Sequence, residues 1–316
     1  MSRSFLRFAA PVLALAVLLP GAAAAHDDPD HQLAQLGAAI ARNPHDAGLY
    51  LQRAELYRFR RDWQAGLADL QAARDLDPRL DAVDLATAEL ALDAGNTGAA
   101  LPAIDRFLAR QPAHAKGHLV RARVLLGDRR DLEAAAEFTR GIDLAAAGAA
   151  GGSALVRPDD YLDRAKALAA AGPEHVAEAI GGLDEGLAAL GHPITLELLA
   201  IELEQGRGDV DAALSRLASI EARANRKETW LARRAEILAS AGRADEAAAA
   251  WRAALAAIDR LPPRTRDSRA TRDLAASIHA RLDATPPHPV IPPGETPSPA
   301  TDATTLSSLA ATRSLR

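Results

Sequence analysis

A short run of histidine and aspartate lies near the start of the chain, where His26–His31 reads HDDPDH. If the chain is cleaved after Ala25, His26 supplies both a terminal amine and a ring nitrogen, and His31 adds a second ring. Such nitrogen ligands suit copper or zinc. The alternative is a polar, frayed terminus, because the first residues of most domains are poorly ordered. Metal binding through His26 is therefore kept as an alternative function.

Sequence motifs for catalysis are absent elsewhere. The chain holds no G-x-S-x-G elbow, no H-E-x-x-H pair and no G-x-x-x-x-G-K-S/T phosphate loop. It has no cysteine, which excludes a thiol nucleophile. Adjacent carboxylates such as Asp159-Asp160 fall at expected helix starts, where acidic residues cap exposed N–H groups. The sequence predicts a protein that is not an enzyme and that needs no cofactor.

The first 25 residues have the three parts of a secretory signal peptide. Arg3 and Arg7 form a basic start, an apolar run follows, and Ala23 and Ala25 offer an A-x-A cleavage site. The run is shorter than the ~20 residues that cross a bilayer. We expect an exported protein whose mature chain spans no membrane, in the periplasm or, as the alternative, secreted.

The composition narrows the choice of partners. The full sequence carries 42 acidic and 37 basic residues, and removal of Arg3 and Arg7 would make it more acidic. This balance argues against nucleic acid and against anionic membrane surfaces as partners. Aromatic residues are 3% of the chain, and alanine supplies much of its apolar content, which suits closely packed helices rather than a sheet.

The stretch Ala47–Pro78 predicts two short amphipathic helices joined by a turn near Arg61-Asp62. The first helix places on one face Tyr50, Ala54 and Tyr57. The second does the same with Trp63, Gly66, Leu67, Leu70, Ala73 and Leu76. A proline ends the pair, since the residue before proline is pushed out of the α region. Pro44, Pro78 and Pro112 are each 34 residues apart, so the pair is one copy of a repeat.

Small residues at two positions mark the later copies. Where the first copy has Ala54 and Gly66, the others have Ala88 and Ala100, Ala122 and Ala134, Ala165 and Ala179, Ala200 and Ala213, and Ala235 and Ala247. Four features depart from the pattern: Asp84 where a large apolar residue is usual, Pro102 inside a helix, the Ala145–Ser153 insertion and a long turn at Pro173. In period and in these positions, roughly residues 32 to 260 resemble the tetratricopeptide repeat (TPR) family.

The resemblance implies an all-α fold, a right-handed superhelical solenoid of antiparallel helix pairs with about six repeats plus terminal capping helices. We expect a helix over 32–42 before the first copy and another over 272–282 after the last. Pro102 should bend the start of its helix by removing a hydrogen bond. The expected domains are a signal peptide at 1–25, a helical repeat domain at 26–284 with an insertion loop near 145–157, and a Pro-rich disordered tail at 285–316.

In the TPR family, the first helix of each pair lines a concave groove that holds a peptide or a partner's helix. The positions that correspond here are Leu51, Glu55, Arg58, Leu85, Glu89, Leu119, Arg123, Leu162, Lys166, Glu197, Ile201, Glu204 and Glu236. For each of them the alternative is a solvated charge or a packing leucine. The Lys/Asn set with which some members clamp a C-terminal carboxylate is missing, so the resemblance does not extend to chaperone-tail binding.

The resulting hypothesis is a non-enzymatic scaffold or adaptor of a bacterial-type cell envelope, with a protein or peptide as partner. Two alternatives stay open beside it and beside metal binding at His26: an accessory or regulatory subunit of an exported enzyme, and a structural array that self-associates. The sequence does not give the partner, the process or the oligomeric state.

Overall fold

The computed structural model describes residues 28–148 and 156–284, and these residues are all-α, with no strand among them. The helices are α1 (Pro29–Arg42), α2 (Ala47–Phe59), α3 (Trp63–Leu76), α4 (Asp81–Asp93), α5 (Thr97–Arg110), α6 (Ala115–Gly127), α7 (Asp131–Ala146), α8 (Pro158–Ala171), α9 (Val176–Leu190), α10 (Ile194–Gly206), α11 (Val210–Arg223), α12 (Glu228–Ser240), α13 (Ala244–Asp259), α14 (Pro263–Arg266) and α15 (Arg269–Ala284). The expected signal peptide, most of the insertion loop and the Pro-rich tail lie outside the described residues. None of the described helices is long and apolar enough to cross a membrane.

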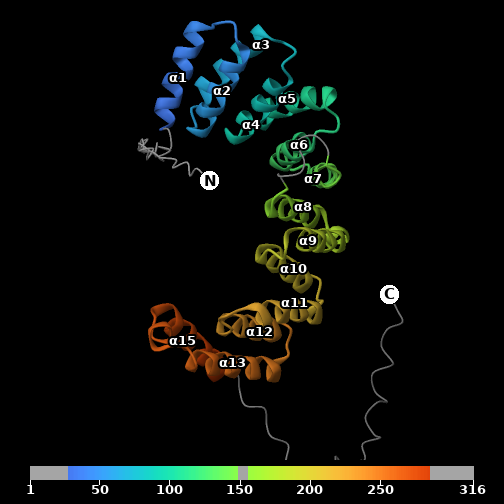
Figure 1. Ribbon diagram of the computed structural model, residues 1–316. Coiled ribbons are helices and arrows are strands. Elements are labelled where there is room, and N and C mark those ends of the chain that lie inside the picture. The colour runs from blue at the N-terminus through green and yellow to red at the C-terminus, as the bar shows by residue number, and fades with distance from the viewer. Residues whose placement is uncertain (1–27, 149–155, 285–316) are drawn as a thin grey trace, which may run out of the picture. The chain divides into compact units, whose positions relative to one another are not determined.

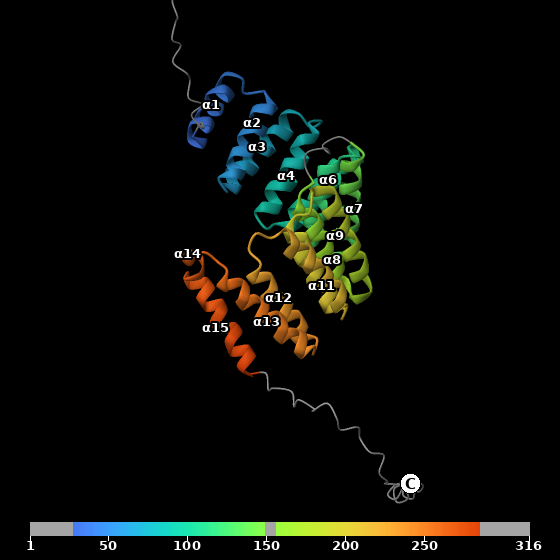
Figure 2. The ribbon, with the colours of Figure 1, turned by 60° about the horizontal axis from the view of Figure 1, so that its bottom comes forward.

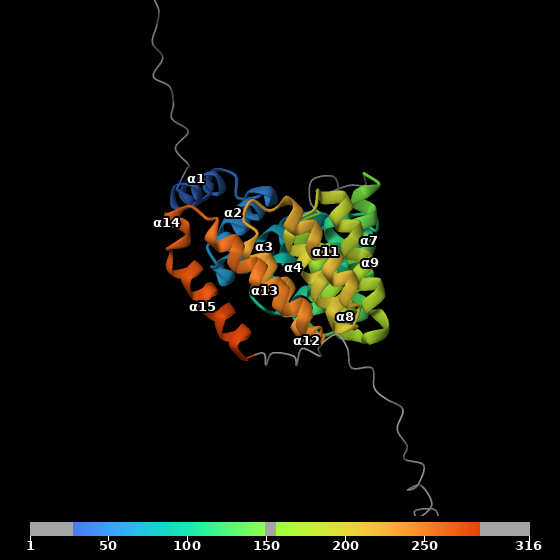
Figure 3. The same cartoon turned by 90° about the horizontal axis from the view of Figure 1, so that it is seen from below.

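The chain divides inside α11, between Arg216 and Leu217, into two compact units. In the first unit, successive helices pack as the pairs α2/α3, α4/α5, α6/α7 and α8/α9, and each pair contacts the next. Figures 1 and 2 show these helices following one another in chain order. In the second unit α12 packs on α13, and α15 packs on α13 in turn (Figure 3). The expected helix pairs and the expected helices before and after the repeats are therefore confirmed.

Local sequence explains where the helices begin and turn. The side chains of Asp46, Asp62 and Asn96 accept hydrogen bonds from the first turns of α2, α3 and α5, at 2.9, 3.2 and 3.1 Å, as N-caps do. Arg61 and Arg129 have φ of 60° at the turn position where Gly95 has 74°. The repeat thus requires a left-handed residue at this point, which glycine adopts more readily than arginine.

Two departures from the repeat pattern, Pro102 and the long turn at Pro173, leave the helix pairs intact. α5 continues through Pro102 as one helix, so the proline does not interrupt it. After Gly172, the 3₁₀ turn Pro173–His175 leads into α9, which accounts for the long turn there.

The recurring small residues lie where helices cross closely. Ala88, Ala122, Ala200 and Ala235 are fully buried, and Ala54 and Ala165 nearly so. Their counterparts on the second helices, Gly66, Ala100, Ala134, Ala179, Ala213 and Ala247, are buried as well. A Cβ atom at Gly141 would lie 2.7 Å from Leu119 Cδ2, closer than carbon atoms pack. Helix pairs approach this closely only because the side chains between them are small.

We expect Ala54→Leu to lower the free energy of unfolding by ~1–3 kcal/mol, because Ala54 is buried against the crossing of α2 and α3 and a larger side chain would overpack it. Denaturant titration followed by circular dichroism measures the change. Leu67→Ala, on the exposed face of α3, serves as a control that should change stability little. An unchanged midpoint for Ala54→Leu would contradict the close crossing.

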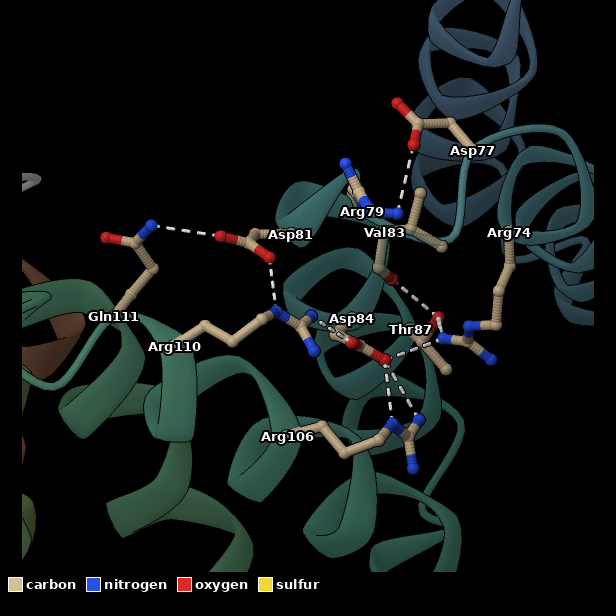
Figure 4. Close-up of polar contacts among 10 residues, drawn as sticks. All are labelled: Arg74, Asp77, Arg79, Asp81, Val83, Asp84, Thr87, Arg106, Arg110 and Gln111. Atoms are coloured by element: carbon tan, nitrogen blue, oxygen red, sulfur yellow. Dashed lines mark hydrogen bonds and ion pairs between the residues drawn. The ribbon is translucent and has the colours of Figure 1, made fainter.

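Asp84 is the departure with the largest structural consequence. It occupies the position that Tyr50, Tyr161 and Leu196 hold in other copies, yet it is buried. Its carboxylate accepts hydrogen bonds from Arg74 of α3 at 2.8 Å, from Arg106 of α5 at 3.0 Å and from Arg110 of α5 (Figure 4). The bridge therefore links the first copy to both helices of the second.

Arg110 and its neighbour extend this cluster, since Asp81 accepts from Arg110 and from Gln111, the latter at 2.9 Å (Figure 4). Burial raises the pKa of Asp84, but hydrogen bonds from Arg110 and Arg106 outweigh it and hold the pKa below its ordinary value. Asp84 therefore stays ionised, with three arginines as its partners.

Candidate functional site

Two adjoining cavities open along the first helices of the first unit, and they meet at Arg58 and Asp93. One, of about 440 Å³, is lined by Glu55, Arg58, Phe59, Arg61, Trp63 and Asp93. The other, of about 390 Å³, is lined by Arg58, Glu89, Leu92, Asp93, Lys116, Leu119, Val120, Arg123 and Arg157. Their volumes fall in the usual range for ligand sites, ~300–1,000 Å³. We call the two cavities together the α2–α6 groove.

The repeat explains why these side chains share one surface. Glu55, Glu89 and Arg123 are 34 residues apart and take the same place on α2, α4 and α6. Because consecutive copies stack with the same orientation, equivalent positions follow one another along the stack. One repeat position, occupied by Glu55, Glu89 and Arg123 in turn, therefore contributes a side chain to the groove from each of three successive copies.

Ion pairs hold the charged side chains of the groove in place. The carboxylate of Glu89 lies 2.5 Å from Lys116 Nζ and 3.6 Å from Arg58 Nη2, and Arg58 Nη1 lies 2.8 Å from Asp93. α2, α4 and α6 are thus tied together across their exposed faces. Surface pairs of this kind stabilise the fold weakly, ~0–1 kcal/mol each, but they restrict where the cations point.

Arg123 is held differently, by a carboxylate beneath the surface. It donates to Asp160, whose side chain is 0% exposed and also accepts the backbone N–H of Arg157 at 2.8 Å, at the start of α8. Arg123 thereby joins α6 to α8. Arg61 and Arg157 form no ion pair with any residue that the structure describes.

The predicted site residues do not all lie in the groove. Those that do are Glu55, Arg58, Glu89, Leu119 and Arg123. Leu51, Leu85 and Leu162 are partly buried against the core, and Lys166 is exposed on α8. Glu197, Ile201 and Glu204 are buried on α10, where Glu204 pairs with Arg216 at 2.7 Å. Glu236 lies on α12 in the second unit, within 3.5 Å of Arg233. The predicted residues that line the groove therefore all come from the first three copies.

The sequence prediction did not include eight of the groove residues: Phe59, Arg61, Trp63, Leu92, Asp93, Lys116, Val120 and Arg157. Asp93 could have been found, because it lies one helical turn beyond Glu89 on the same face. Arg157 precedes α8, after a chain segment whose length varies from the repeat, so no spacing rule places it.

No arrangement in the groove suggests catalysis, and a buried pair elsewhere has a structural role. His118 Nδ1 lies 2.6 Å from Glu137, as in an acid–base pair, but His118 is buried and its Nε2 lies 3.0 Å from the Pro112 carbonyl. Both ring nitrogens are thus used within the fold. Among the described residues no three histidine, cysteine, aspartate or glutamate side chains form a group that could hold a metal ion. The His26 hypothesis falls outside the described residues.

Comparison with known proteins gives the fold. No protein-family model and no curated protein matches this sequence. Among solved structures, the C-terminal part of a TPR repeat-containing protein from Cytophaga hutchinsonii is 12% identical, covers 78% of this chain and 95% of that chain, and has a TM-score of 0.58. A tetratricopeptide repeat protein from Parabacteroides merdae is 14% identical over 80% of this chain and 93% of that one, with a TM-score of 0.48.

A third similar structure is YrrB, described as a TPR protein with an unusual peptide-binding site. It is 15% identical over 78% of this chain and 97% of its own, with a TM-score of 0.40. The first of the three, with the helix pairs and the buried small residues, shows that the chain has the tetratricopeptide-repeat fold.

Proposed function

We propose that this TPR-fold chain is a non-enzymatic interaction scaffold that holds a segment of another protein in the α2–α6 groove. The observation that carries the proposal is the groove itself, two adjoining cavities of about 440 and 390 Å³ on the exposed faces of three successive first helices. A repeat array buries its own core through neighbouring copies, so such a face is left free for a partner. Among the described residues, neither a catalytic arrangement in the groove nor a group of metal ligands favours another use of this surface.

The groove has the composition of a recognition surface. It combines charged groups, which give orientation and specificity, with apolar side chains, which give area. Phe59 is 78% exposed at its edge, and large exposed aromatic side chains beside a cavity are frequent anchors of interfaces. The helices beneath are fixed by ion pairs, so a partner would meet an organised surface and would lose less entropy on binding.

We place the scaffold in the cell envelope. The support for this setting is the signal-like sequence of residues 1–25, which lies outside the described residues. Fractionation of cells that express the full chain with a C-terminal tag tests it. Tagged protein in the periplasm, shortened by cleavage after Ala25, is the expected result, and full-length protein in the cytoplasm would contradict export.

We expect Arg58→Glu to abolish capture of the partner. Arg58 contributes to both cavities, and its replacement by glutamate places three carboxylates together, removes a hydrogen-bond donor and repels an acidic ligand. The measurement is cross-linking of the full chain in envelope extract, followed by mass spectrometry of the captured peptides. Arg123→Glu is the less clean variant, because it would oppose the buried Asp160 and disturb the fold.

The matched control is Arg252→Glu. Arg252 is exposed on α13 in the second unit and forms no described ion pair, so the net charge changes equally without touching the groove. Circular dichroism of all variants confirms that they are folded. A partner that Arg58→Glu and the wild type capture equally well would show that the groove is not the binding site.

A further inference from the structure

We propose that the α2–α6 groove is selective for an acidic segment, in which aspartate or glutamate side chains alternate with apolar ones. The inference rests on the proposed function and names the chemistry of the partner. It concerns the cavity of about 390 Å³ between α4, α6 and the start of α8.

The charge of this cavity is opposite to that of the whole chain. Its lining holds four cations, Arg58, Lys116, Arg123 and Arg157, against two carboxylates, Glu89 and Asp93. The full sequence, in contrast, has a net charge of −5. Asp160 beneath Arg123 offsets part of the surplus, but it is completely buried and cannot meet a ligand. An approaching segment therefore meets a local excess of positive charge, which favours and steers an acidic partner.

The cations remain available although they are paired. The side chains of Arg58 and Lys116 are 32% and 38% exposed; Lys116 pairs with Glu89, and Arg58 pairs with Asp93 and, at a longer distance, with Glu89. Both cations keep unused donors, because an ammonium group has three and a guanidinium has five. Arg157 lines the cavity and forms no ion pair with described residues, so its guanidinium group can donate two hydrogen bonds to a ligand carboxylate.

The floor between the cations is apolar. Leu92 is its partly exposed residue, Leu119 and Val120 are buried beneath it, and Phe59 and Trp63 continue the apolar surface into the adjoining cavity. A uniformly acidic segment would leave this floor uncovered. Alternating charged and apolar side chains match it, since one set reaches the cations while the other covers the floor.

The probes are two fluorescent peptides of equal length, the first built of glutamate, leucine and glycine, the second with lysine in place of every glutamate. Fluorescence anisotropy against the full chain measures their affinity. We expect the glutamate peptide to bind at least about tenfold more tightly than the lysine peptide, with affinity falling as salt is added. Equal affinity, or preference for the lysine peptide, would overturn the proposal.

Three variants connect the selectivity to this cavity. Arg157→Glu should weaken binding of the glutamate peptide about tenfold, since it removes a cation that holds no other partner. Glu89→Gln should strengthen binding, because Glu89 competes for Lys116 and Arg58. Arg252→Glu should have no effect. If Arg157→Glu and Arg252→Glu are equivalent, any acidic preference comes from general charge and the proposal is wrong.

The outcome separates this inference from the proposed function. A protein partner that is lost with Arg58→Glu, together with no preference for the glutamate peptide, would leave the scaffold standing and overturn acidic selectivity. If Arg58→Glu still captures the protein partner and still binds the glutamate peptide, both the proposed function and the acidic selectivity are wrong.

Discussion

Asp84→Ala is expected to lower the free energy of unfolding by about 2–4 kcal/mol. The carboxylate is buried and is shared by Arg74, Arg106 and Arg110, so its removal breaks every polar link among these four residues. Breaking a buried pair costs ~3–5 kcal/mol when the remaining charge stays buried. Here the three arginine side chains are 31–49% exposed and regain water, which reduces the cost.

Denaturant titration measures the total loss of unfolding free energy in Asp84→Ala, and hydrogen exchange shows which helices are destabilised. Because stability in a repeat array is a sum of local terms, the loss should appear first as faster exchange in α3, α4 and α5. Asp84→Leu, which restores the kind of residue found at Leu196, should cost less than Asp84→Ala, since an apolar side chain of suitable volume can replace an ion pair. If the alanine variant is as stable as the wild type, the arginine cluster contributes nothing.

The charge itself can be tested through pH. The pKa of Asp84 is held below its ordinary value, so the folded state binds fewer protons at this site than the unfolded state. Its contribution is present above the unfolded pKa of ~3.9 and is lost as pH falls through the folded pKa. The stability difference between the wild type and Asp84→Asn should therefore stay constant from neutral pH to just above the unfolded pKa of ~3.9 and shrink as the pH falls below it. A difference independent of pH would mean that shape, not charge, matters at this position.

The repeat could be predicted because its requirement is local. Two helices cross closely only where both side chains are small, so Ala54, Gly66 and their counterparts recur at a period that the sequence displays. Turn positions follow in the same way, since Arg61, Gly95 and Arg129 repeat a left-handed residue at one point of the pattern. The turns depend on one copy alone, and the small residues depend on their own copy and the next, since a Cβ at Gly66 would meet both Ala54 and Leu90.

The pairing of charges could not be predicted, because it depends on how copies stack. Arg123 and Asp160 are 37 residues apart, on either side of a segment that breaks the repeat's spacing. Family positions likewise placed Glu197 and Glu204 in the groove, yet both are buried, and Glu204 pairs with Arg216 of α11. α10 keeps the register of the other first helices, since Ala200 is buried as Ala54 is, so the burial of these carboxylates depends on what packs beside α10.

Phe138→Ala is expected to lower the free energy of unfolding by about 3–5 kcal/mol, the usual cost of a buried phenylalanine and of the cavity left behind. Phe138 is 0% exposed on α7 and lies in a large cluster of buried side chains, with Leu119, Tyr161 and Leu183. Denaturant titration measures the loss. A change below about 1 kcal/mol would contradict a close-packed cluster at this point.

Phe59→Ala is the matched control, because the same atoms are removed from a side chain that is 78% exposed. It should change stability by less than about 0.5 kcal/mol. The two variants also distinguish two effects on peptide binding: loss of the packing beneath the groove, and loss of a surface that the peptide contacts. Leu119 belongs to the Phe138 cluster and lines the groove, so Phe138→Ala should weaken peptide binding by loosening the groove's floor. Phe59→Ala should weaken peptide binding without lowering the stability of the fold, because it removes a surface that the peptide covers. Groove and core thus share Leu119, so a change in the core beneath it also alters the groove.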